Sequence, residues 1–166
     1  MNYIRLRQNN LCVENISAQK LTKKYKTPFY CYSLSQLESK YNNFSNAFKK
    51  TKPLICFSVK SNSNLTILKE LKRLGSGADV VSIGELLKAT KAGISGNKIV
   101  FSGIGKPDEE IRAAIKKRVL LINIESESEA DLINKISQKM SRKTSVGIRL
   151  NPNITAKTHK KISTGG

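Results

Sequence analysis

Short apolar runs recur along this chain at a regular interval, and helical patterns fill the stretches between them. The runs begin about 20 to 25 residues apart, at residues 55–59, 78–81, 99–101, 120–124 and 146–150. Strand–helix units that repeat at this period form a parallel sheet, which is either an open doubly wound sheet or a (β/α) barrel. The repeat therefore predicts an α/β fold.

The helices expected between these runs span residues 65–74, 83–92, a segment that Pro107 opens, and 127–140. Gly75-Ser76-Gly77 closes the first helix. Because this glycine-rich turn precedes a strand, it is not the phosphate-binding turn of a dinucleotide fold, which follows a strand. The pattern thus favours a barrel. A closed barrel needs eight strands, and we expect a partial (β/α)8 TIM barrel, truncated after about the fifth repeating strand.

The first 27 residues do not follow the repeat. Ile4–Leu6 and Leu11–Val13 are predicted to be short strands, and Ile16–Tyr25 a short helix with Ser17 as its N-cap. We therefore expect residues 1–27 to form a separate amino-terminal segment. Residues 28–166 are expected to form the barrel part, beginning with a strand at Phe29–Ser33 and a helix from Ser35 to Phe48.

Composition narrows the classes of partner. The formal net charge is +18, but the lysines are scattered along the chain without a basic stripe interleaved with aromatic residues, so we expect only weak, salt-sensitive adhesion to polyanions and no specific nucleic-acid partner. No apolar run approaches the roughly 20 residues of a membrane span. Cys12, Cys31 and Cys56 form no Cys-x-x-Cys pair, which predicts neither a metal site nor a disulfide framework and favours the cytoplasm.

Polar residues follow several of the predicted strands. Lys60 ends the first strand, Asp79 lies on the second with Glu85 just beyond it, Glu125 ends the fourth, and Arg149 lies near the end of the fifth. The carboxyl ends of parallel strands share one edge of a sheet, which is where barrels place their active sites. We therefore expect a lysine, carboxylates and an arginine to gather there.

Lys60 is the candidate for covalent chemistry. A partly desolvated amine at such an edge can act as a nucleophile toward a carbonyl, and pyridoxal phosphate is a common carbonyl cofactor. The alternative is that Lys60 only ends the strand and extends into water. The corresponding alternatives are helix N-terminal capping for Asp79 and Glu85 and an ordinary structural ion pair for Arg149.

Seven segments in series also carry a resemblance, which extends over nearly the whole chain. They are Phe57–Asn64, Gly75–Ser82, Gly84–Leu86, Lys98–Gly103, Asn123–Glu127, Arg149–Pro152 and Thr158–Gly165. In order and spacing they resemble the amino-terminal part of the diaminopimelate decarboxylases. The resemblance implies a barrel of the alanine-racemase-like type that uses pyridoxal 5'-phosphate.

The resemblance also implies roles for individual residues. Lys60 matches the family's Schiff-base lysine, Asp79 and Arg149 match positions that line the cofactor, and Glu85 matches more loosely. The implied reaction is decarboxylation of meso-2,6-diaminopimelate to L-lysine. Alternatives are another basic-amino-acid or carboxynorspermidine-type decarboxylase, and a non-catalytic remnant. His159 lies in a family segment that precedes the ring-stacking histidine, and no catalytic role is assigned to it.

The family pattern extends beyond what this sequence matches. The resemblance implies a later ring-stacking histidine, a phosphate-binding loop, a glutamate for the pyridine nitrogen, and a carboxyl-terminal β-domain at a dimer interface. We expect this chain to be a truncated or split family member with little activity alone. Its expected partners are an amino-acid substrate and either a second copy or a complementing carboxyl-terminal chain, and residues 1–27 are expected to pack on the β-domain.

Overall fold

A computed structural model describes residues 3–152 of the chain, so the predicted segment Thr158–Gly165, with His159, lies outside the described residues. The chain divides into two compact units, residues 1–53 and residues 54–166. Each unit is considered by itself. None of the helices in the described part combines the length and apolar character that crossing a bilayer requires.

The first unit contains a small antiparallel sheet and two helices. The elements are β1 (Ile4–Arg7), β2 (Asn10–Val13), β3 (Ile16–Ser17), α1 (Ala18–Lys24) and α2 (Leu34–Ala47), with the strands in the order β1-β2-β3. Ser17 caps α1 as predicted, because its hydroxyl accepts a hydrogen bond from the Lys20 backbone N–H at 3.3 Å.

The predicted strand at Phe29–Ser33 is wrong. These residues are not in a strand, and residues 29–32 are exposed. Ser33 instead caps α2 by accepting a hydrogen bond from the Gln36 N–H at 3.0 Å. The Glu14 carboxylate accepts a hydrogen bond from the Ser33 hydroxyl at 2.6 Å and from the Ser35 N–H at 3.2 Å. Capping of α2, rather than strand pairing, therefore satisfies the backbone at this point.

The second unit is a five-stranded parallel sheet in sequential order. Its strands are β4 (Cys56–Ser58), β5 (Gly77–Val80), β6 (Ile99–Phe101), β7 (Leu121–Ile124) and β8 (Val146–Ile148). Between them lie the 3-10 turns η1 (Val59–Ser61) and η2 (Gly96–Lys98) and the helices α3 (Leu65–Arg73), α4 (Ile83–Lys91), α5 (Asp108–Lys116) and α6 (Glu127–Lys139).

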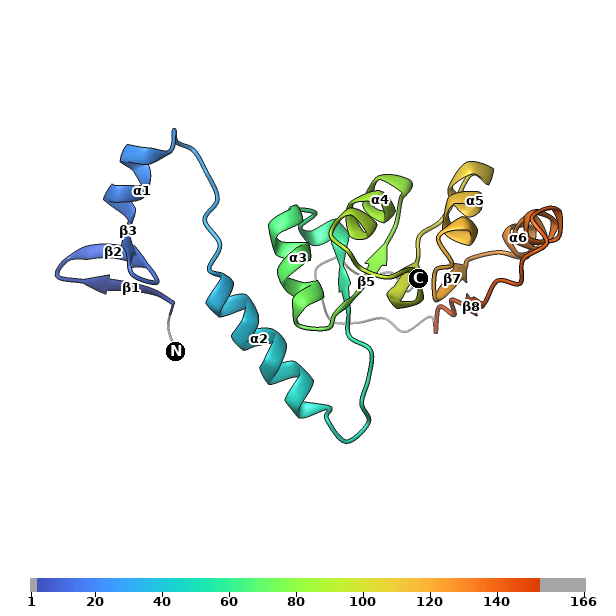
Figure 1. Cartoon of the computed structure of the whole chain (residues 1–166), viewed down its shortest axis with the longest axis horizontal. Helices are drawn as coiled ribbons and strands as arrows, with labels where there is room; N and C mark the ends of the chain where they lie inside the picture. Colours follow the sequence, from blue (N-terminus) through green and yellow to red (C-terminus); the bar gives the residue numbers. More distant parts are fainter. Residues whose placement is uncertain (1–2, 153–166) are drawn as a thin grey trace. The chain divides into compact units, whose positions relative to one another are not determined.

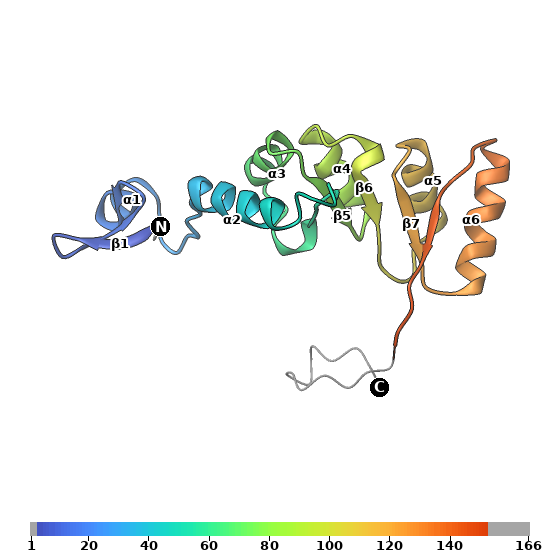
Figure 2. The ribbon, with the colours of Figure 1, turned by 90° about the horizontal axis from the view of Figure 1, so that it is seen from below.

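All four of these helices lie on one side of the sheet (Figures 1 and 2). A doubly wound sheet would reverse its strand order at one point and carry helices on both faces. Sequential order with helices on one face is instead the arrangement of a barrel wall, because each right-handed crossover returns the chain to the next position along the sheet. The structure confirms an α/β fold that forms part of a barrel.

The core of the second unit lies between the sheet and its helices. Strand residues in it include Ala78, Val80, Ile99, Phe101 and Ile122, none of which is exposed. The helices contribute the buried residues Leu68, Leu86, Ala89, Ile111, Ala114, Ile115, Ile133 and Ile136. Alternation along the strands turns their remaining residues toward the opposite face, which a closed barrel would turn inward.

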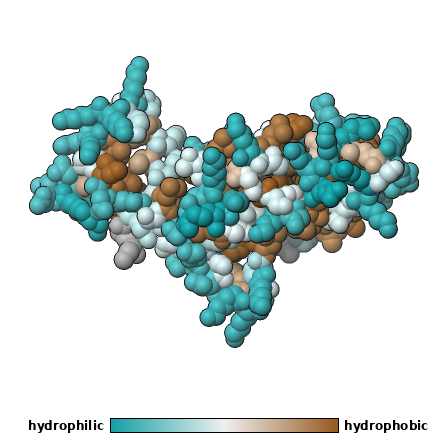
Figure 3. Space-filling view, viewed as in Figure 1, coloured by the Kyte–Doolittle hydropathy of each residue, from teal (hydrophilic) through white to brown (hydrophobic). Residues whose placement is uncertain are grey.

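The first strand differs from its prediction. The apolar run at residues 55–59 predicts a strand, but β4 covers only Cys56–Ser58 and these residues are half-buried. The reason is that β4 lies at an edge of the sheet and pairs with β5 alone. Apolar side chains also remain exposed at the other edge, notably Ile148 and Leu150, and hydrophobic patches alternate with hydrophilic side chains in the space-filling view (Figure 3).

Candidate functional site

Lys60 lies where the sequence places it, directly after the first parallel strand. It occupies η1, whose backbone is held by the Ser61 hydroxyl, which donates to the Ser58 carbonyl at 2.7 Å. The partial desolvation expected for Lys60 is not observed, since the residue is exposed beside an edge strand. Within residues 3–152 no hydrogen bond or ion pair engages its amine, so the Nζ atom is open to an incoming group.

A row of hydrogen-bonded polar side chains crosses the face of the sheet opposite the helices. The Asn123 amide donates to the Ser102 hydroxyl at 3.0 Å, and this hydroxyl donates to Asp79 Oδ1 at 2.5 Å. From the other side, the Ser58 hydroxyl donates to Asp79 Oδ2 at a longer 3.4 Å. The row thus connects β7 to β4, the strand that carries the Lys60 turn, and Asp79 is its charged member.

Cys56 lies on the same face as Asp79. Burial, and secondly the negative charge of Asp79, raise the pKa of the Cys56 thiol above its ordinary value. The thiol is therefore kept protonated at neutral pH.

Arg149 pairs with Glu125 rather than with Asp79. Its guanidinium lies 3.2 Å from Glu125 Oε1, and the Arg149 side chain is 56% exposed. An ion pair this exposed is worth at most about 1 kcal/mol. The structure thus brings Asp79 into contact with Ser58, near Lys60, and Glu125 into contact with Arg149. Among the described residues no hydrogen bond or ion pair joins these two groups.

Glu85 has a structural role in the first turn of α4. Its backbone N–H donates to the Ser82 hydroxyl at 3.3 Å, and its carboxylate accepts from the Val81 N–H at 3.0 Å. This is a close variant of the capping box. Capping, one of the two readings that the sequence allowed, is what the structure shows, and the assignment of Glu85 to the cofactor rests on the resemblance alone.

A buried ion pair near the carboxyl ends of the strands was not predicted from the sequence. Lys106 donates to the carbonyls of Gly103 and Asn123 at 2.5 and 2.7 Å and to Glu129 Oε1 at 3.0 Å. The two side chains are only 2% and 9% exposed. The Ser126-x-x-Glu129 pattern signals a helix start, but nothing local to Lys106 signals burial, because Asn123 and Glu129 are 17 and 23 residues away.

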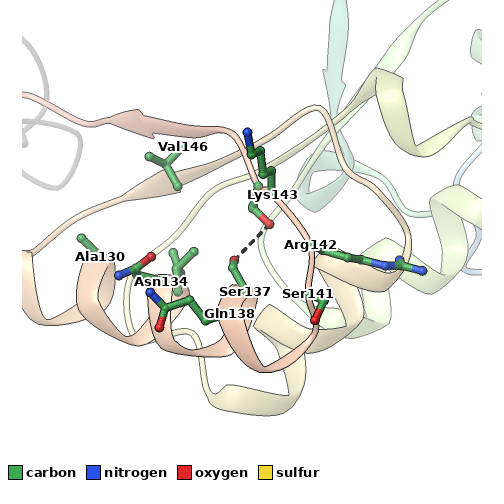
Figure 4. Close-up of a pocket in the computed structure, with 10 residues that line it drawn as sticks. Ala130, Asn134, Ser137, Gln138, Ser141, Arg142, Lys143 and Val146 are labelled. Atoms are coloured by element: carbon green, nitrogen blue, oxygen red, sulfur yellow. Dashed lines mark hydrogen bonds between the residues drawn. The ribbon is translucent and has the colours of Figure 1, made fainter.

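Two other kinds of site were considered in the described residues, a metal site and a cavity. The described residues contain no cluster of three or more potential metal ligands. A cavity of about 650 Å³ lies between α6 and β8, with Ser137, Gln138, Arg142 and Val146 in its wall (Figure 4). Val146 turns toward the helix side of the sheet, so this cavity is on the opposite face from Asp79.

Comparison with known proteins agrees with the architecture. The family described as pyridoxal-dependent decarboxylase, pyridoxal binding domain, matches residues 34–166. A diaminopimelate decarboxylase of Helicobacter pylori strain J99 is 51% identical over 147 residues, which are 89% of this chain and 36% of that protein. This chain therefore spans just over a third of the length of that relative.

Solved structures show the same partial coverage. The diaminopimelate decarboxylase from Helicobacter pylori complexed with L-lysine has a TM-score of 0.85 at 49% identity, covering 89% of this chain and 37% of its own. The diaminopimelate decarboxylase from M. jannaschii in complex with L-lysine has a TM-score of 0.90 at 36% identity, covering 99% of this chain and 39% of its own. This chain accordingly belongs to the pyridoxal-dependent decarboxylase family, in which it resembles the amino-terminal part of the diaminopimelate decarboxylases.

Proposed function

We propose that this chain supplies the lysine-bearing, cofactor-binding part of an enzyme that decarboxylates meso-diaminopimelate to L-lysine. The observation that carries the proposal is the position of Lys60, on the turn that follows the first of five sequential parallel strands. The proposal is also supported by the 51% identity of the chain to a diaminopimelate decarboxylase and by its likeness to diaminopimelate decarboxylases solved in complex with L-lysine.

The residues at this edge fit pyridoxal phosphate. The Lys60 amine is exposed and has no partner among residues 3–152, so an aldehyde can reach it. Lys60, Asp79 and Arg149 would hold the cofactor, with Glu85 as a looser candidate. When bound, pyridoxal phosphate supplies an aldehyde that joins amines and a ring that takes up the electrons left when carbon dioxide departs.

The residues of this chain would bind the cofactor and fix the shape of the site. Lys60 would hold the cofactor through its amine nitrogen and would take up or release a proton at that atom. Asp79 places a negative charge level with Ser58, the residue immediately before the turn that carries Lys60. The Lys106–Glu129 pair fixes the loop after β6, so the edge keeps its shape while ligands enter and leave.

The proposal includes partners. Both edge strands of the five-stranded sheet lack a second neighbour among the described residues. We propose that the remaining barrel strands come from residues equivalent to the rest of the relatives, on this polypeptide or a complementing one, and that two copies pair. Residues 1–27 would then pack on the carboxyl-terminal β-domain. A cytoplasmic location completes the proposal, supported by three free cysteines.

Release of carbon dioxide from diaminopimelate tests the function. We expect no measurable turnover by the 166-residue chain with pyridoxal phosphate, and turnover when the remaining part of the Helicobacter pylori relative is added. Lys60→Ala should abolish the restored activity, whereas Lys69→Ala, at an exposed position on α3, should leave it unchanged. Lysine offered as substrate tests the other basic-amino-acid decarboxylases. No activity with either substrate in the complemented protein would indicate a remnant.

A further inference from the structure

The hydrogen-bonded row on the inward face has a consistent direction. Asn123 donates to Ser102, and Ser102 donates to Asp79. Because a carboxylate can only accept, the Ser102 proton is directed to Asp79, which leaves the Ser102 oxygen to accept the amide hydrogen of Asn123. Donors aligned in this way polarise one another and strengthen each bond. Asn123 on β7 therefore acts on a carboxylate on β5, two strands away.

The backbone of β8 leaves space for this arrangement. Gly147 lies opposite Asn123 in the parallel register. A Cβ atom at position 147 would lie 2.5 Å from Asn123 Oδ1 and 3.3 Å from a Leu121 methyl group. Gly147 is not among the residues with positive φ, so its backbone does not require glycine. We therefore attribute the glycine at position 147 to the space that the Asn123 side chain occupies.

We infer that Ser102 and Asn123 are positioning residues that hold the Asp79 carboxylate beside the Lys60 strand, and that residue 147 is glycine so that Asn123 can take part. This inference rests on the proposed function and adds residues to its site. The row continues from Asp79 to the Ser58 hydroxyl, and the Ser58 carbonyl closes the turn that carries Lys60.

The first test uses the full chain without cofactor. Gly147→Ala should lower the urea midpoint of unfolding in the wild-type background because the new methyl group displaces the Asn123 amide. In an Asn123→Ala background the same substitution should raise the midpoint, since alanine is otherwise favoured over glycine in a strand. An equal shift in the two backgrounds would overturn the coupling between positions 123 and 147. Asn134→Ala, at an exposed position on α6, is the matched control background and should leave the effect of Gly147→Ala unchanged.

The second test asks whether the row acts on Lys60. The chain is incubated with pyridoxal phosphate, reduced with borohydride and mapped by mass spectrometry, and labelling of Lys60 is divided by that of Lys69. Ser102→Ala should lower this ratio about tenfold, the size expected when a hydrogen bond to a charged group is lost. Asn123→Ala should lower it less, by about threefold, because its bond to the Ser102 hydroxyl joins two neutral groups. Ser102→Thr, which keeps the hydroxyl, should restore it.

The outcomes separate the two proposals. A wild-type chain with no preference for Lys60 would overturn the positioning role, while carbon dioxide release by the complemented protein still decides the proposed function and the Gly147 coupling decides the row by itself. A preference for Lys60 that Ser102→Ala and Asn123→Ala leave unchanged would overturn the positioning role alone.

Discussion

Lys106 shows how one buried charge can be accommodated at the edge of a sheet. Its three ammonium hydrogens are all used, two on backbone carbonyls and one on Glu129. Burying a charge without such partners costs several kcal/mol. The residue therefore holds three segments together: the loop after β6, the end of β7 and the first turn of α6.

Lys106→Met tests this role. The apolar side chain fills a similar volume but leaves the Glu129 carboxylate buried without its cation, so we expect the free energy of unfolding to fall by about 3 to 5 kcal/mol. Urea denaturation followed by circular dichroism measures the change. Lys135→Met, at an exposed position on α6, should change it by less than about 0.5 kcal/mol. A similar small change for Lys106→Met would mean that the pair contributes little.

The pKa of the Cys56 thiol depends in part on the negative charge of Asp79. Because that charge contributes to the raised pKa of the thiol, Asp79→Asn should lower the pKa, seen as faster alkylation of Cys56 near pH 8 in site-resolved mass spectrometry. The raised pKa also means that Cys56 contributes to the free energy of unfolding. This contribution is fully present below the ordinary thiol pKa and is lost as the pH rises through the raised pKa of the folded state. Unchanged alkylation in the variant would place the cause in burial alone.

At the level of elements, the starts of α4 and α6 share one design. Ser82 and Ser126 are the N-caps, and Glu85 and Glu129 reach back to the N–H of the residue before each cap. The two glutamates nevertheless differ, since Glu129 also receives the Lys106 ammonium. Within residues 3–152, capping accounts for the hydrogen bonds of the Glu85 carboxylate and backbone N–H.

Glu85→Gln distinguishes capping from cofactor binding. Glutamine keeps an acceptor for the Val81 N–H, so we expect only a small loss of stability, whereas Ser82→Ala should cost about 1 kcal/mol. Thermal unfolding of the two variants provides this comparison. Labelling of Lys60 by pyridoxal phosphate and borohydride should stay unchanged in Glu85→Gln if the residue only caps α4. A clear decrease would support the looser family assignment.

Element types were predictable where their signals are local. Helices were predictable because Ser17, Gly75 and Pro107 mark helix ends in the sequence. Phe29–Ser33 has the composition of a strand but forms none, because strand formation depends on a neighbour that the sequence does not identify. The row from Asn123 to Asp79 was missed for the same reason. Its members are 21 and 23 residues apart.

At the level of the whole molecule, charge is the dominant property. The structure places many of the cations of residues 54–150 in the last turns of helices, where they complement the helix dipole. These cations are Lys72, Arg73, Lys88, Lys91, Lys116 and Lys139. Stabilisation of helices thus explains part of the excess of lysine and arginine. For these residues no polyanionic ligand has to be assumed.

Retention on heparin tests the consequence of the +18 charge. We expect the chain to bind at low ionic strength and to elute steeply as salt increases, because counterion release dominates such binding. Single-stranded oligonucleotides of different sequence should bind with equal affinity under the same conditions. A sequence preference that survives at about 0.15 M salt, where surface charges are largely screened beyond roughly 8 Å, would contradict a purely non-specific attraction.

The sequential order of β4 to β8 has a consequence for how the second unit is made. Each strand after β4 is paired with the strand that precedes it in the chain and that leaves the ribosome before it. A new β/α unit can therefore dock on one that is already synthesised. Contacts between near neighbours in sequence close small loops, which lowers the entropic barrier to folding. The unit can therefore grow by addition at one end during translation, without waiting for distant parts of the polypeptide to arrive.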